Sequence, residues 1–182
     1  MVGTFDKSRD FREYLSTLAL NGVCYESAWT VSTITAGNQV YAEITTHPTK
    51  YTLYNYRELT SDKDRLFFTN YTDYTLTSTD DAVKVFSLKL DSPYTSGVVF
   101  NEVTPNTIDP ASQGAIVPIF GDPSGGSKST GNDKADSAIR IIPPNSRFLV
   151  CLGNQSSNDC FAQLVLRWCE VSPDYLPNQI EL

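Results

Sequence analysis

Apolar residues recur at every second position along most of this 182-residue chain, in short runs that are separated by turn residues. Near the C-terminus, for example, Ala162, Leu164, Leu166 and Trp168 alternate with more polar residues and are expected to face a core. About ten such runs follow at regular spacing, with no helix of crossover length between them. This pattern predicts an all-β, antiparallel β-sandwich or barrel and argues against a parallel α/β sheet. The expected strands are residues 24–35, 39–46, 51–59, 65–70, 74–79, 82–90, 98–103, 115–120, 139–142, 147–152 and 161–171.

One segment near the N-terminus has helical periodicity. Its apolar residues Phe11, Tyr14, Leu15 and Leu18 share one face, with Ser8 as the expected N-cap and Asn21-Gly22 as the stop signal. Because this stripe is narrow, we expect the helix to lie on a sheet, on a neighbouring subunit or on a larger assembly. The chain thus divides into an arm (1–22), a sandwich domain (23–172) with a polar surface loop (121–138), and a tail (173–182).

Composition and charge limit the partners that can be expected. The formal net charge of −7 argues against nucleic acid, because neutralising phosphates requires clustered Lys and Arg. No run of apolar residues is long enough to predict a membrane span, and the polar N-terminus does not predict a secretory signal. We therefore expect a protein that is made in the cytoplasm.

The four cysteines are Cys24, Cys151, Cys160 and Cys169. They contain no Cys-x-x-Cys pair, and their spacing does not match a structural zinc site. Cytoplasmic synthesis favours free, buried thiols. The alternative is a disulfide between Cys151 and Cys160, which would lie opposite each other if the last two strands formed a hairpin.

The sequence offers no combination of residues that predicts an enzyme, a cofactor site or a metal site. A phosphate-binding loop would need Lys directly after its last glycine, whereas Ser127 separates Gly126 from Lys128. His47 is the only histidine and lies in a turn beside a proline. The pairs Asp62/Asp64 and Asp80/Asp81 are typical of solvated turns, because sequence neighbours do not span a catalytic cleft.

Tyrosines are concentrated in one stretch of the chain. Tyr51, Tyr54 and Tyr56 are followed by Tyr71 and Tyr74. A large rigid side chain with a polar tip suits a protein interface, so we expect this stretch to form a subunit contact. The alternatives are that half of these residues face the core, or that they form a shallow platform for a sugar.

The C-terminal run from Ile141 to Glu170 resembles a pattern found in virion proteins of tailed bacteriophages. Its Pro-Pro-Asn-Ser turn leads into a strand, an Asn/Ser-rich turn and a closing strand that ends in Trp-Cys-Glu. Residues 83–90 and 98–103 are similar to the middle of the same family. The N-terminal helix and the 121–138 loop depart from the pattern.

The resemblance implies a jelly-roll-like capsid decoration or cement protein without enzymatic activity, located in the virion. Its partners would be the major capsid protein or other virion proteins, and a homo-oligomer is implied because such decorators are commonly trimers. The helical arm from Asp6 to Leu20 and the 121–138 loop are the expected contact elements. A tail, fibre or head–tail connecting protein of a phage is one alternative, and a carbohydrate-binding jelly-roll module is the other.

Overall fold

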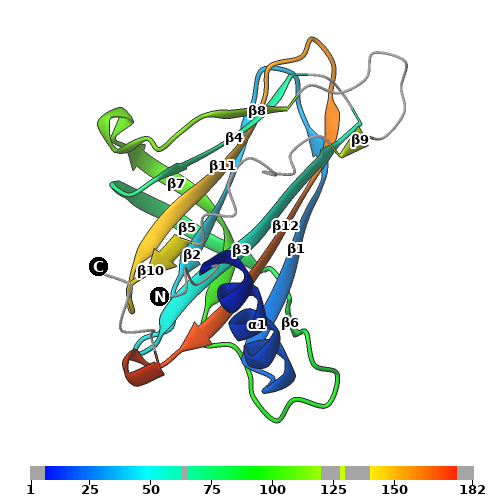
Figure 1. Ribbon diagram of the computed structural model, residues 1–182. Coiled ribbons are helices and arrows are strands. Elements are labelled where there is room, and N and C mark those ends of the chain that lie inside the picture. The colour runs from blue at the N-terminus through cyan, green and yellow to red at the C-terminus, as the bar shows by residue number, and fades with distance from the viewer. Residues whose placement is uncertain (1–6, 63–64, 120–127, 130–139, 176–182) are drawn as a thin grey trace.

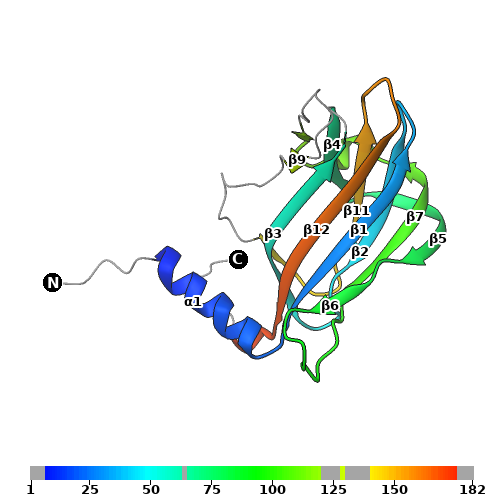
Figure 2. The same cartoon turned by 90° about the vertical axis from the view of Figure 1, so that its right-hand side faces the viewer.

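The alternation of apolar and polar side chains places the core between two antiparallel sheets. One helix lies beside the sheet that contains the first strand of the chain (Figures 1 and 2). The computed structural model describes residues 7–62, 65–119, 128–129 and 140–175. It confirms the expected β-sandwich with a short N-terminal helix. Its helix and strands are α1 (Lys7–Leu20), β1 (Cys24–Ile34), β2 (Gln39–Thr45), β3 (Tyr51–Ser61), β4 (Leu66–Tyr71), β5 (Tyr74–Ala82), β6 (Val85–Ser87), β7 (Val99–Ile108), β8 (Val117–Ile119), β9 (Lys128–Ser129), β10 (Arg140–Ile142), β11 (Arg147–Asn154) and β12 (Cys160–Val171), with short 3-10 helices at Pro110–Ser112 and Pro173–Tyr175.

The strand order is that of a jelly roll with an insertion. One sheet has the order β10-β3-β12-β1-β6, with β9 beside β3, and the other has the order β5-β7-β2-β11-β4-β8. Without β5, β6, β7 and β9, the remaining strands form two sheets of four, β10-β3-β12-β1 and β2-β11-β4-β8. Successive strands alternate between the two sheets except at β4 and β8, as in a jelly roll. The strands β5 to β7 are inserted at that point, and they lengthen both sheets.

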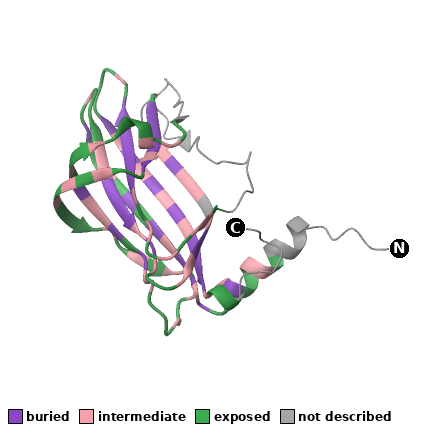
Figure 3. Ribbon diagram, turned by 90° about the vertical axis from the view of Figure 1, so that its left-hand side faces the viewer, coloured by how far each residue is buried: buried purple, intermediate pink, exposed green. Residues whose placement is uncertain are grey.

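The main core lies between the sheets and is centred on the closing strand. Ala162, Leu164, Leu166 and Trp168 of β12 are buried, which confirms the face assigned from the alternation. They pack against residues of both sheets, including Trp29 of β1 and Phe100 of β7. Figure 3 shows the alternation as buried and partly exposed bands along the strands.

The second sheet is strongly curled. Only Thr72 and Asp73 connect β4 to β5, although β7, β2 and β11 lie between these two strands in the sheet. The curl buries a separate apolar cluster on the outer face of this sheet, which includes Leu149, Cys151, Tyr71 and Tyr74. This cluster explains why neighbouring positions such as Val150 and Cys151 are both buried.

Some boundaries differ from the predicted ones. The expected strand 82–90 is reduced to Val85–Ser87, because the chain crosses from one sheet to the other on either side of it. The helix begins at Lys7, so Ser8 lies inside its first turn and is not the N-cap. Of the predicted loop 121–138, only Lys128–Ser129 is described, as a two-residue strand paired with β3; the rest, and residues 176–182 of the tail, lie outside the described residues.

Candidate functional site

The helix α1 is attached to the sandwich through its C-terminal end. Its last turn closes with two bonds, Gly22 N–H to the Ala19 carbonyl (3.0 Å) and Val23 N–H to the Leu18 carbonyl (3.3 Å). These bonds form a Schellman motif, which requires a left-handed residue, and Gly22 has φ +76°. Figures 2 and 3 show the rest of the helix leading away from the sheets.

The predicted helical stripe contacts the chain's own sheet. Leu18 is buried, and Tyr14 and Leu15 are half-buried, in a cluster with Leu53, Cys169 and other residues of the outer face of the first sheet. Burial raises the pKa of the Tyr14 hydroxyl. The side chain of Phe11 lies outside the described part of the structure. Part of the stripe is thus already occupied within the molecule.

The predicted tyrosine face is not a single surface. Tyr54 packs against the main core and stacks on Trp168, with ring centroids 6.3 Å apart, and burial raises its pKa. Tyr71 and Tyr74 belong to the cluster on the other sheet. Tyr51 is half-buried at the start of β3, and nothing is described of the Tyr56 side chain. Among the described side chains, the structure therefore places Tyr54 apart from Tyr71 and Tyr74.

Two cysteines form a disulfide, which corrects the expectation of four free thiols. Cys24 and Cys169 are bonded, and they lie directly opposite each other on the adjacent strands β1 and β12. Cys151 and Cys160 are free and buried. They cannot face each other across a hairpin, because β11 and β12 belong to different sheets. The sequence could not reveal the bonded pair, since pairing of the first and last strands of the sandwich decides it.

Exposed apolar side chains lie at the end of α1 and on residues 86–94, which are hydrogen-bonded to the chain just after that end, and we call them together the arm-base surface. Leu20, at the end of the helix, is 75% exposed, and Leu90 is fully exposed. Most of this surface comes from residues 86–94 of the insertion, between the middle of β6 and the start of β7. This segment lies beside the helix end in Figure 2. The Leu88 N–H donates to the Cys24 carbonyl (2.9 Å) at the start of β1, four residues after the helix ends. The members of the arm-base surface are Leu20, Phe86, Leu88, Leu90 and Tyr94.

This surface could not be predicted from the sequence, because the alternation of residues 82–90 is typical of a strand. In such a strand Leu88 and Leu90 would have been core residues. One signal in the sequence pointed away from a strand at Leu88 and Leu90. They are followed directly by Asp91-Ser92-Pro93, which is typical of a turn. Ser92 in this turn donates to the Gly22 carbonyl (2.8 Å) and so joins the inserted segment to the helix terminus.

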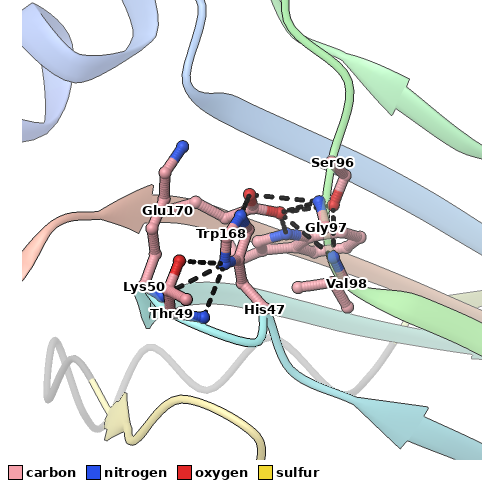
Figure 4. A network of polar contacts seen from close by, with 8 residues as sticks. All are labelled: His47, Thr49, Lys50, Ser96, Gly97, Val98, Trp168 and Glu170. Atoms are coloured by element: carbon pink, nitrogen blue, oxygen red, sulfur yellow. Dashed lines mark hydrogen bonds and ion pairs between the residues drawn. The ribbon is translucent and has the colours of Figure 1, made fainter.

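A buried carboxylate fixes residues 96–98, the part of the insertion that leads into β7 (Figure 4). Glu170, at the end of β12, is 2% exposed. It accepts hydrogen bonds from the Ser96 hydroxyl (2.5 Å), the Gly97 N–H (3.0 and 3.1 Å) and the Val98 N–H (3.3 Å). The Trp168 indole N–H donates to the same carboxylate at 3.4 Å. A buried charge is tolerated only with such donors, so Glu170 ties residues 96–98 to the closing strand.

His47 lies beside this carboxylate, but the group is not arranged as a hydrolase site. Its Nε2 is 3.9 Å from Glu170 Oε2. Its Nδ1 accepts from the Thr49 N–H (3.0 Å) and the Lys50 N–H (3.1 Å). Ser96 donates to Glu170, whereas nucleophilic catalysis needs a hydroxyl that donates to the base. The arrangement is that of a structural brace.

The other candidates for chemistry do not converge either. Among the described residues no three potential metal ligands come together. Asp62 accepts from the Phe161 N–H (2.7 Å) and Asp80 from the Ser78 hydroxyl (3.0 Å), so each has a local structural partner. Asp64 and most of the glycine-rich loop lie outside the described residues.

Comparisons with family models, curated proteins and solved structures found no match to this chain. In the described part of the chain, no helix has the length and apolar character needed to cross a membrane. The arm-base surface and its supports are thus the features from which a function can be argued.

Proposed function

We propose that this chain is a non-enzymatic structural protein of a virus particle, most simply a decoration or cement protein that binds the assembled capsid. The observation that carries the proposal is the arm-base surface. Several large apolar side chains exposed on neighbouring segments of a folded protein favour association, because leaving them in water is unfavourable. The jelly-roll core does not require this surface, since it lies on an insertion and on a helix end.

The arm-base surface has a rigid support. The disulfide joins β1 to β12 directly beneath the end of α1. The Gly22 motif, the Ser92 hydroxyl and the Glu170 brace hold the neighbouring backbone in place. A preorganised surface loses little conformational entropy on binding, which favours association at many equivalent sites.

The particle context comes from the resemblance of residues 141–170 to virion proteins of tailed phages. A jelly-roll body with a helical arm suits this role, because the body is rigid and the arm adds a second point of attachment. Two linked contacts bind more tightly than either alone. The partner would be the major capsid protein, and the chain would act as a homo-oligomer on the shell.

Counting copies in purified particles tests this proposal. Quantitative mass spectrometry should give a ratio to the major shell protein close to a simple fraction of one. A handful of copies per particle would instead indicate a tail, fibre or connector protein. Absence from particles would overturn the proposal and favour the carbohydrate-binding module.

The contact surface is tested with purified protein and shells that lack it. Replacing Leu90 and Tyr94 by serine should weaken binding at least about tenfold, because two apolar contacts are lost. Both side chains are exposed, so the melting temperature should not change. Ile116→Ser is the control, since Ile116 is 56% exposed, close to the 55% of Tyr94, but lies outside the arm-base surface. Equal binding by all variants would exclude this surface as the contact.

A further inference from the structure

A groove of about 340 Å³ lies where the chain crosses from one sheet of the sandwich to the other. It is lined by residues 28–30 of β1 and by residues 82–84, which lead from the end of β5 in one sheet to β6 in the other. Phe86 of β6 and Glu102 of β7 complete the lining. The groove therefore brings side chains of both sheets to one place.

The Glu102 carboxylate has a fixed position in this groove. Its Oε1 accepts a hydrogen bond from the Trp29 indole N–H at 2.9 Å. The Trp29 side chain is 2% exposed and packs in the main core, so the donor cannot move away. No other described residue donates to this carboxylate. Its second oxygen, Oε2, is therefore free to accept from a bound molecule.

The Lys84 ammonium group supplies hydrogen-bond donors to the same groove. Lys84 is exposed, and its ammonium group forms no ion pair with any residue in the part of the chain that the structure describes. The groove thus keeps a cationic donor and the Glu102 acceptor apart. An ion of either sign would be attracted by one of these side chains and repelled by the other. The pair therefore favours a neutral ligand.

Phe86 adds an aromatic ring to this groove. Its side chain is 57% exposed, although the ring is large and apolar. The face of such a ring packs well against another flat apolar surface. A hexopyranose ring has a surface of this kind, formed by its C–H groups, and its hydroxyl groups both donate and accept hydrogen bonds. A neutral sugar therefore matches the aromatic ring, the acceptor and the donor together.

We propose that this groove binds a neutral hexopyranose unit of a glycan. The sugar ring would stack on Phe86, one hydroxyl would donate to Glu102 Oε2, and another would accept from Lys84 Nζ. A small number of polar groups beside an apolar surface is the usual composition of a small-ligand site, and the volume lies in the usual range. This site adds a ligand to the structural role proposed above and does not depend on that role.

Magnetic resonance of the isotope-labelled, isolated full chain tests this proposal, with neutral oligosaccharides of glucose, galactose and mannose as probes. The chain has two tryptophans. Trp29 lines the groove, whereas the Trp168 indole N–H donates to Glu170. Binding should shift the Trp29 indole resonance to saturation and leave the Trp168 indole resonance unchanged. Added salt should not weaken binding, because the ligand is uncharged.

Two variants test the individual contacts. Phe86→Ala should weaken binding at least about fivefold, because the stacking surface is lost. Tyr94→Ala is its matched control, since Tyr94 is an aromatic residue of similar exposure, 55%, that does not line the groove. Glu102→Gln keeps an oxygen for the Trp29 indole but replaces the free oxygen by a donor, so it should also weaken binding at least about fivefold.

The proposal is overturned when none of these sugars gives a saturable shift of the Trp29 indole resonance. It is also overturned when neither Phe86→Ala nor Glu102→Gln weakens binding, or when only acidic oligosaccharides bind. Tyr94 belongs to the arm-base surface and Glu102 does not. Tyr94→Ala should therefore weaken shell binding alone and Glu102→Gln sugar binding alone, so either proposal can fail without the other.

Discussion

Glu170 shows how one residue can hold two distant parts of the chain together. It follows the buried apolar residues of β12 in the sequence. Its carboxylate accepts hydrogen bonds from donors at residues 96–98. Its position at the end of a strand was visible in the sequence. Its role was not, because the donors lie more than 70 residues earlier.

Glu170→Gln should lower the free energy of unfolding by about 2–4 kcal/mol, since the amide nitrogen is a donor placed among donors. Urea unfolding measures this loss. Asp81→Asn is the control, because Asp81 is exposed, and it should change stability by less than about 0.5 kcal/mol. A similar small effect for Glu170→Gln would show that the brace contributes little.

Two glycines allow the effect of crowding to be separated from that of backbone conformation. Gly22 and Gly37 have nearly the same φ, +76° and +77°. A Cβ at Gly22 would lie 2.6 Å from the Ser92 hydroxyl oxygen, whereas nothing lies within 4 Å at Gly37. Gly37→Ala should cost about 1 kcal/mol of unfolding free energy, and Gly22→Ala about 2–3 kcal/mol. Equal losses in urea unfolding would mean that the helix end moves freely away from Ser92.

At the level of elements, the sequence predicts where strands occur better than how they pair. Alternation depends on neighbouring residues, so the buried face of β12 was predicted correctly. Which strands pair depends on contacts between residues far apart in the chain. For that reason the prediction that β11 and β12 form a hairpin was wrong. The inserted segment was misassigned because Val85, Leu88 and Leu90 suit a strand, although the chain must leave its sheet there.

The helix α1 should come off the sheet when its buried contact is weakened. Leu18 is buried against the outer face of the first sheet, whereas Leu20 is exposed. Leu18→Ser should cost about 2 kcal/mol of local stability and speed tryptic cleavage at Arg9 and Arg12 more than tenfold. Leu20→Ser should leave the cleavage rate unchanged. If Leu18→Ser is cut at the wild-type rate, the helix is not held by this contact.

At the level of the whole molecule, the disulfide is the longest-range constraint. It joins residues separated by 145 positions and thereby restricts the unfolded chain. Reduction should lower the free energy of unfolding by about 4–5 kcal/mol, measured in urea with and without reductant. The variant Cys24→Ala/Cys169→Ala should be less stable and indifferent to reductant. Indifference of the wild type would contradict the pairing.

The free thiols give a second measurement of the same pairing. Burial raises the pKa of the Cys151 thiol to about 12, so it stays protonated and unreactive at pH 8 in the folded protein. After denaturation without reductant, a thiol reagent should count only Cys151 and Cys160. All four cysteines should react once reductant is added.

The position of the disulfide also determines how the molecule carries mechanical load. The arm enters the sandwich just before Cys24, and the chain leaves it just after Cys169. A pull between the arm and the C-terminal end therefore passes through one covalent bond, while the 145-position span between the two cysteines bears no tension. A molecule pulled at these two ends would therefore keep the segment between the two cysteines folded for as long as the disulfide stays intact.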